Sequence, residues 1–230
     1  MLPHAGGLAS SFGEWVPHLV PRVVPRPLDV PGRSRFYTAP PVAMSIPAMA
    51  LLVAEVIRPS LIAETEFGLL GYSMGALIAY EVALKLKSDG FHAVCLVACA
   101  CDPPDAERAS IHCLDDNAFD VALAEIGGMP AEIAHDRELM DLFRPTLRRD
   151  IQATETYCAD PVQALDCPIH VLGGVDDKET SIKELEGWQR FTSAHCTLKM
   201  FQNGHFFARG NERLVARYIL SRLQLDRPMG

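Results

Sequence analysis

The five residues Gly71-Tyr72-Ser73-Met74-Gly75 constrain this chain most, because G-x-S-x-G is the spacing of a nucleophile elbow. Residues 67–70 before them predict a short apolar strand, and residues 76–84 after them predict a helix. A Cβ at either flanking glycine would collide with the neighbouring strand and helix. The pattern therefore predicts an α/β fold with Ser73 as nucleophile. The alternative is a glycine-rich turn with a surface serine.

A serine nucleophile needs a general base, and the base needs a carboxylate that orients it. His205 follows residues 196–201, which predict a strand near the end of the chain. Residues 169–174 predict another strand, which leads into Asp176 and Asp177. One helix and one strand between this pair and His205 would bring acid and base onto neighbouring loops. Asp177 is the preferred acid, and Asp176 is the alternative.

The other histidines occupy positions that do not suit the base. His170 lies inside a predicted strand, so we expect a buried side chain with one hydrogen bond. The remaining ones lie in polar or helical surroundings and are expected to be solvated: His18, His92, His112, His135 and His195.

Acyl transfer also needs two backbone N–H groups that point at the developing oxyanion. Met74 directly follows the candidate nucleophile and would offer its amide at a helix N-terminus. The second donor usually comes from the loop after an early strand. Residues 3–7 end in paired glycines that let the backbone turn, so Ala5 is the candidate. A flexible N-terminal tail is the alternative.

Motifs spread along the chain occur in a specific order: Leu2-Pro3-His4-Ala5-Gly6-Gly7, Pro31-Gly32-Arg33, Gly71-Tyr72-Ser73-Met74-Gly75-Ala76, Gly173-Gly174-Val175-Asp176-Asp177 and Gly204-His205-Phe206-Phe207. Over nearly its whole length the chain resembles the type II thioesterases, stand-alone α/β-hydrolases that accompany non-ribosomal peptide synthetases and polyketide synthases. The resemblance implies a mostly parallel sheet with helices on both faces. It also implies the roles just described: Ser73 as nucleophile, His205 as general base, Asp177 as orienting acid, Ala5 and Met74 as oxyanion hole.

The resemblance further implies a substrate. The acyl group would be a thioester on the phosphopantetheine arm of an acyl or peptidyl carrier protein, and the enzyme would remove stalled or wrongly primed groups. No cofactor or metal would be needed. A small-molecule carboxylesterase would share the triad without needing a carrier. A catalytically silent binding module of hydrolase fold is a third hypothesis, against which the intact triad argues.

The chain departs from the family at its start. Members usually have a further stretch with an apolar strand ahead of the loop 3–7, whereas this chain opens at Met1. A truncated start and a minimal first strand both fit, and the sequence leaves the choice open.

The 230 residues, 49% of them apolar, suit one α/β domain over 1–230. Between the strand ending near Ala98 and the strand at 169–174 lies an unusually long crossover. Helices are expected there over 114–126 and 137–157, and elsewhere over 45–57 and 181–194, with a loop over 29–41.

The crossover, about 105–157, is expected to cover the active site as a lid with Gly127-Gly128 as its hinge. Its apolar residues would line an acyl-binding groove or dock the lid to the core: Phe119, Leu123, Leu139, Leu142 and Phe143.

Composition and charge argue against several classes of protein: nucleic-acid-binding, membrane-spanning, secreted and disulfide-stabilised. The net charge of −8 argues against a nucleic-acid partner. No apolar run is long enough to span a membrane, and the first residues lack a signal-peptide pattern. The odd number of cysteines, seven, indicates a reducing cytoplasm rather than a disulfide framework. Cys99 and Cys101 follow a predicted strand and are expected to be buried core side chains, not metal ligands.

An acidic carrier would need a local basic patch on this acidic chain. Arg144, Arg148 and Arg149 lie in one predicted helix and are the candidates. A solvated helix face is the alternative.

Overall fold

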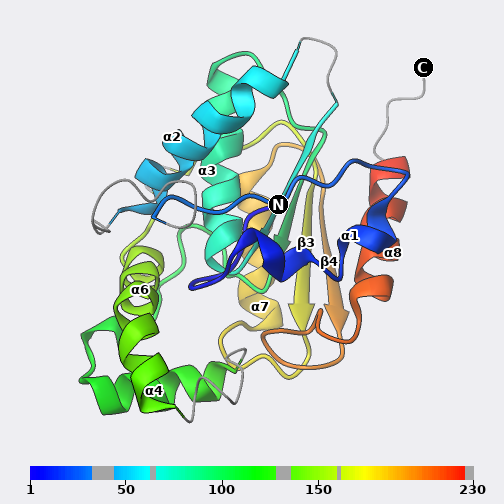
Figure 1. Ribbon diagram of the computed structural model, residues 1–230. Coiled ribbons are helices and arrows are strands. Elements are labelled where there is room, and N and C mark those ends of the chain that lie inside the picture. Colours follow the sequence, from blue (N-terminus) through cyan, green and yellow to red (C-terminus); the bar gives the residue numbers. More distant parts are fainter. Residues whose placement is uncertain (33–43, 63–65, 128–135, 160–161, 226–230) are drawn as a thin grey trace.

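A parallel sheet forms the centre of the computed structural model, which describes residues 1–32, 44–62, 66–127, 136–159 and 162–225 (Figure 1). Within these residues the sheet has four strands in the order β1-β2-β3-β4, and each pairs in parallel with the next. Their bounds are β1 Gly68–Tyr72, β2 Cys95–Cys99, β3 Ile169–Gly174 and β4 Cys196–Phe201.

The two middle strands, β2 and β3, are buried along their whole length, which explains their continuous apolar sequences. The strands predicted over 169–174 and 196–201 have these bounds in the structure, and the predicted strands before them shift by one or two residues. Parallel strands end at the same edge of the sheet. The residues that follow each strand are therefore brought together there.

Helices cover both faces of the sheet, as expected (Figure 1). One face packs against α2 (Ile46–Ile57) and α3 (Met74–Ser88). The other face packs against the short α1 (Val16–Leu19) and the long α8 (Glu212–Leu225). The chain thus has three layers, and no helix in the described residues is both long and apolar enough to cross a membrane.

The helix expected over 181–194 is not one α-helix. A short α7 (Ile182–Leu185) continues into a 3-10 helix, η5 (Glu186–Phe191). Gly187 weakens α-helix formation there. The tighter 3-10 turn places Trp188 and Phe191, three residues apart, on one face, and both are completely buried.

The start of the chain is tied to the sheet through Leu2. The Leu2 amide donates to the Leu70 carbonyl at 2.8 Å, and the Tyr72 amide donates to the Leu2 carbonyl at 3.0 Å. Leu2 thereby forms a one-residue parallel bridge beside β1. This pairing anchors the loop 3–7 beside the elbow, so the loop is not a flexible tail.

The crossover between β2 and β3 contains the two expected helices, α4 (Asp116–Ile126) and α6 (Arg137–Glu155). Each begins at an aspartate cap: Asp115 accepts from the Ala118 amide, and Asp136 accepts from the Leu139 amide. Gly127 ends α4 at a φ of 80°. Gly128, the other half of the expected hinge, lies outside the described residues.

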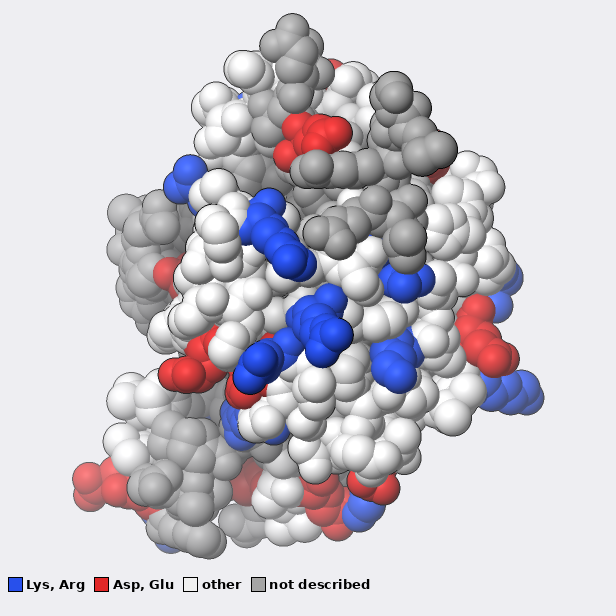
Figure 2. Space-filling model, turned by 90° about the vertical axis from the view of Figure 1, so that its right-hand side faces the viewer, with Lys and Arg blue, Asp and Glu red and all other residues white. Residues whose placement is uncertain are grey.

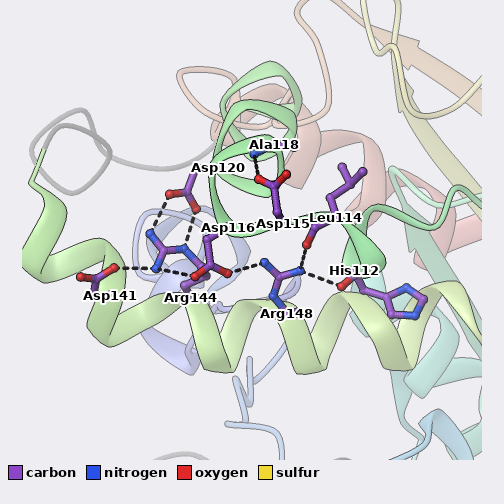
Figure 3. A network of polar contacts seen from close by, with 9 residues as sticks. All are labelled: His112, Leu114, Asp115, Asp116, Ala118, Asp120, Asp141, Arg144 and Arg148. Carbon is purple, nitrogen blue, oxygen red and sulfur yellow. Dashed lines mark hydrogen bonds and ion pairs between the residues drawn. The ribbon is translucent and has the colours of Figure 1, made fainter.

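Arg144 of α6 is paired inside the crossover (Figure 3). Its guanidinium donates to both carboxylate oxygens of Asp120 on α4, at 2.9 and 2.7 Å, and to Asp141 at 2.6 Å. The side chain is only 11% exposed. This fork therefore fixes α4 against α6.

Arg148, one turn further along α6, also holds the crossover together (Figure 3). It donates to the backbone carbonyls of His112 and Leu114 at 2.7 and 2.6 Å and to Asp116 at 2.8 Å. Its guanidinium lies over the Phe119 ring, 4.1 Å from the centroid. Two of the three arginines expected to form a docking patch, Arg144 and Arg148, therefore have their guanidinium groups engaged within the crossover. The third, Arg149, donates to the Thr146 hydroxyl of the same helix at 3.1 Å.

We expect Arg144→Ala to lower the free energy of unfolding by about 1–3 kcal/mol, because Asp120 loses a charged, two-bond partner. Thermal unfolding and limited proteolysis within the crossover measure this. Arg137→Ala, at the exposed start of the same helix, is the control and should change little. Equal unfolding temperatures for the two variants would contradict the bracing role.

Candidate active site

Ser73 lies in the sharp turn between β1 and α3, with a φ of 52°. A Cβ at Gly71 would lie 2.0 Å from the Gly75 carbonyl oxygen, and one at Gly75 would lie 2.2 Å from the Leu2 carbonyl oxygen. Both contacts are impossible, which confirms why the flanking positions are glycine. The Ser73 amide donates to the Cys99 carbonyl at 2.7 Å, so β2 also holds the turn in place.

Asp177 and His205 lie side by side on the loops after β3 and β4. Nδ1 of His205 is 3.0 Å from Oδ2 of Asp177, whose side chain is completely buried. The carboxylate also accepts hydrogen bonds from the Glu179 amide and the Thr180 hydroxyl, both at 2.9 Å. Burial alone raises the pKa of Asp177, but the hydrogen bonds and the attraction to His205 together hold it below its usual value. Asp177 is therefore an anion that orients the imidazole.

Asp176 points elsewhere. It is exposed, and its amide donates to the Asn203 carbonyl at 3.1 Å. Successive side chains of an extended segment leave the backbone in opposite directions, so only one of the two can reach the histidine. The structure brings Asp177, and not Asp176, to His205.

Ser73 and His205 line the same cavity, about 590 Å³ in volume. The loop 3–7 contributes Ala5 to its wall, and the crossover contributes several side chains, among them Leu123 and Phe143. The other expected groove residues do not line it. Phe119 is buried between the crossover helices, while Leu139 and Leu142 are exposed.

Of the two oxyanion candidates, Ala5 lies in the cavity wall and Met74 is the first residue of α3. The first amides of a helix have no partner within the helix, and the helix dipole favours negative charge beside them. The Met74 side chain is completely buried, so the core fixes this end of the helix.

Asp150, on α6, is a residue that the sequence did not single out. Its Oδ2 accepts a hydrogen bond from the Gly6 amide at 2.6 Å, and its side chain is buried. Gly6 has a φ of 71°, and a Cβ there would lie 2.4 Å from Leu147 of the same helix. The crossover therefore fixes the backbone next to Ala5. An aspartate within a charged helix carries no signal of this contact, which spans 144 residues.

Tyr72, the variable residue of the elbow, was also missed. Its hydroxyl donates to the His205 carbonyl at 2.6 Å, and its ring stacks on Phe206 at a centroid distance of 5.9 Å. Burial raises the pKa of Tyr72 well above its usual value, so the hydroxyl stays a donor. The elbow thus holds the loop that carries His205.

Asp102 follows β2 and lines the same cavity. Its Oδ1 is buried and has no hydrogen-bond partner among the described residues. Burial, together with repulsion by Glu184, raises the pKa of Asp102 to about 7. A carboxyl beside the reaction site therefore changes charge around neutral pH.

The remaining histidines and cysteines mostly follow expectation. His170 is buried, with Nδ1 2.7 Å from the Thr197 hydroxyl. His112 is not solvated as expected, because its side chain is 16% exposed and its Nδ1 lies 2.5 Å from Glu155. His135 lies outside the described residues. Cys99 and Cys101 are buried in the core, as expected.

The family described as "Thioesterase domain" matches residues 1–223. This chain belongs to that family. Membership confirms the expected class of enzyme, a hydrolase of thioesters, and the expected α/β-hydrolase fold.

Similar proteins include a probable cadicidin biosynthesis thioesterase of Streptomyces griseus, 32% identical over 98% of this chain. The chain spans 62% of that relative's length. Among solved structures, the type II thioesterase BorB from the borrelidin biosynthetic cluster is 31% identical, with a TM-score of 0.85 over 96% of this chain and 90% of its own. YbtT, a type II thioesterase from the yersiniabactin NRPS/PKS biosynthetic pathway, is 31% identical, with a TM-score of 0.84 over 98% and 92%. The resemblance to type II thioesterases is confirmed.

We expect Asp177→Asn to lower kcat by on the order of a thousandfold or more, because the amide would favour the wrong imidazole tautomer. Asp176→Asn, the neighbouring control, should stay within about twofold, since an exposed rim side chain contributes little. Release of free thiol from an acyl thioester measures both. The opposite ranking would assign the acid to Asp176.

We expect Asp150→Ala to lower kcat about tenfold or more, because the loop that carries Ala5 loses its buried acceptor and the candidate oxyanion donor moves. Asp150→Asn keeps an oxygen that can accept from the Gly6 amide and should retain most of the activity. KM should change little in either variant. If the two variants lose kcat to the same extent and unfold at the same lowered temperature, Asp150 serves only the fold.

Proposed function

We propose that the chain is a type II thioesterase that removes acyl groups from the phosphopantetheine arm of acyl or peptidyl carrier proteins. The observation that carries this proposal is the meeting of Ser73 with the Asp177–His205 pair at one cavity, in a chain of the thioesterase family. The whole chain, 1–230, acts as one α/β-hydrolase domain. It needs no cofactor.

Acylation begins when His205 takes the Ser73 proton on Nε2 and Oγ attacks the thioester carbonyl carbon. Asp177 supports this step because its carboxylate accepts a hydrogen bond from Nδ1–H, which leaves Nε2 without a proton and able to accept one. Negative charge moves to the carbonyl oxygen, where the amides of Ala5 and Met74 stabilise it. The carbon–sulfur bond then breaks, and His205 returns the proton to the leaving thiol.

Deacylation repeats the sequence with water. His205 deprotonates a water molecule that attacks the acyl-serine, and the proton passes to Ser73 Oγ as the acid leaves. The enzyme thus returns to its starting state, and its net reaction consumes thioester and water and yields thiol and carboxylic acid.

The crossover 105–157 acts as a lid in this proposal. Leu123 of α4 and Phe143 and Ile151 of α6 form an apolar part of the cavity wall, which suits an acyl chain. A lid that bears on the acyl chain excludes water from the acyl-serine until the thiol has left.

A carrier-bound substrate is favoured by the relatives. YbtT is a type II thioesterase from an NRPS/PKS biosynthetic pathway. The resemblance to this class of enzyme implies a thioester on a carrier protein as the substrate. The role is then editing, the removal of stalled or wrongly primed groups. None of the seven cysteines, all of which lie in the described residues, forms a disulfide, which suits a reducing cytoplasm.

The test compares one acyl group on three leaving groups: a carrier protein, coenzyme A and nitrophenol. We expect kcat/KM to be at least about tenfold higher for the carrier thioester, because only the carrier adds protein contacts. Ser73→Ala, which leaves the turn intact, should abolish turnover of all three. A preference for the nitrophenyl ester would indicate a small-molecule carboxylesterase instead, and wild-type-like activity of Ser73→Ala would overturn the mechanism.

A further inference from the structure

Exposed arginines gather on one side of this acidic protein. Figure 2 shows the side of the molecule that bears α8, where Lys and Arg lie across the middle and Asp and Glu lie mostly toward the edges. The exposed arginines of α8, of the segment before it and of the loop after α1 define the α8 face: Arg22, Arg26, Arg209, Arg213 and Arg217. The chain as a whole carries a net charge of −8, so this face is opposite in sign to the rest.

Arg213 and Arg217 form the centre of the α8 face. They are four residues apart on one helix, so they lie on the same side, one turn from each other. The opposite side of α8 packs on the sheet through Val215 and Ile219. Neither guanidinium has an ion-pair partner among the described residues, in contrast to Arg144 of the crossover. Their charge is therefore available to a partner.

The α8 face reaches the rim of the cavity through Arg209. The Arg209 guanidinium lies over the Phe206 ring, 4.7 Å from its centroid. Phe206 lines the cavity next to His205. A line of basic residues therefore runs from the catalytic cavity along α8, with Arg209 at its inner end.

We propose that the α8 face is the docking site of an acidic carrier protein whose phosphopantetheine arm enters the cavity past Phe206. This inference rests on the proposed function and assigns its partner to a surface. Acidic side chains of the carrier would face Arg213 and Arg217. The arm is joined to its carrier through a phosphodiester, an anion that suits the guanidinium of Arg209 at the rim.

The charges of the face fit a protein surface better than a polyanion. Glu212, the first residue of α8, and the exposed Glu14, two residues before α1, would repel continuous rows of phosphates. A folded carrier presents separate carboxylates that can avoid these two positions. Such rim charges act mainly on the rate of encounter, and salt weakens them.

The test uses the full chain with Arg213→Glu and Arg217→Glu combined. The substrates are one acyl group on a phosphopantetheinylated carrier of net negative charge and the same group on free pantetheine. We expect kcat/KM for the carrier to fall about tenfold or more at low salt, with the pantetheine thioester within about twofold of wild type. The salt dependence seen with wild type and carrier should flatten in the variant.

The control combines Arg58→Glu, in the turn after α2, with Arg137→Glu, at the start of α6; both residues are exposed and their elements lie away from the α8 face (Figure 1). Arg58 has an exposed ion pair with Asp89 at 3.3 Å, a contact of the kind that contributes little to stability. It makes the same charge change and should leave both substrates unaffected. An equal loss on carrier and pantetheine in the α8 variant would show that the arginines serve the fold and would overturn the proposal. So would an equal loss on the carrier in the control, which would reduce the effect to net charge.

Failure of the docking face and failure of the proposed function give different results. If wild type prefers the carrier thioester over the pantetheine thioester and the α8 variant has the same kcat/KM for the carrier, only the docking face is overturned. Wild type with no preference for the carrier over pantetheine overturns the carrier-directed function. Binding of a short DNA duplex or of anionic vesicles that the α8 variant loses, with carrier kinetics unchanged, would assign the face to that partner instead.

Discussion

The contact between backbones at the elbow is the constraint on which the rest of this structure depends. Gly71 and Gly75 are packed so closely against each other and against Leu2 that no side chain fits between them. This packing forces Ser73 into its positive φ and places it above the sheet. It also draws the first residues of the chain alongside β1, so the loop with Ala5 lies in the same cavity wall as the serine.

Two residues extend this constraint to the other parts of the site. Tyr72, inside the elbow, holds the backbone of His205 through its hydroxyl. Asp150, from the crossover, holds the backbone of Gly6. The loops that carry the proposed base, His205, and the proposed oxyanion donor, Ala5, are thus fixed by side chains of neighbouring elements, and Asp177 fixes the imidazole itself. Such positioning residues set the geometry that acyl transfer requires without touching the substrate.

Arginine has two different uses in this molecule. Arg144 and Arg148 are paired within the crossover and fix α4 to α6, which keeps the wall of the cavity in place. Arg213 and Arg217 project from α8 with no ion-pair partner in the part of the chain that is described, on an otherwise acidic protein. The position of an arginine on a helix does not by itself separate the two uses. They differ in whether a carboxylate lies close enough to pair with the guanidinium.

The sequence by itself determined the fold class and the candidate triad, because both depend on local patterns. Apolar stretches at strand length, the paired glycines around Ser73 and the placement of His205 after a predicted strand are readable within a few residues. The strand bounds at β3 and β4 follow from the same local signal. The single α-helix expected after β3 was wrong, because burial of Trp188 and Phe191 favours a 3-10 helix there over the α-helix that propensity predicts.

Only the tertiary structure decided the contacts between distant segments. It brings Asp177 rather than Asp176 to His205, and it joins Asp150 to the Gly6 amide, Tyr72 to the His205 carbonyl and Arg148 to Asp116. These depend on which side chains the packed layers bring within about 3 Å of each other, and spacing along the chain does not encode that distance.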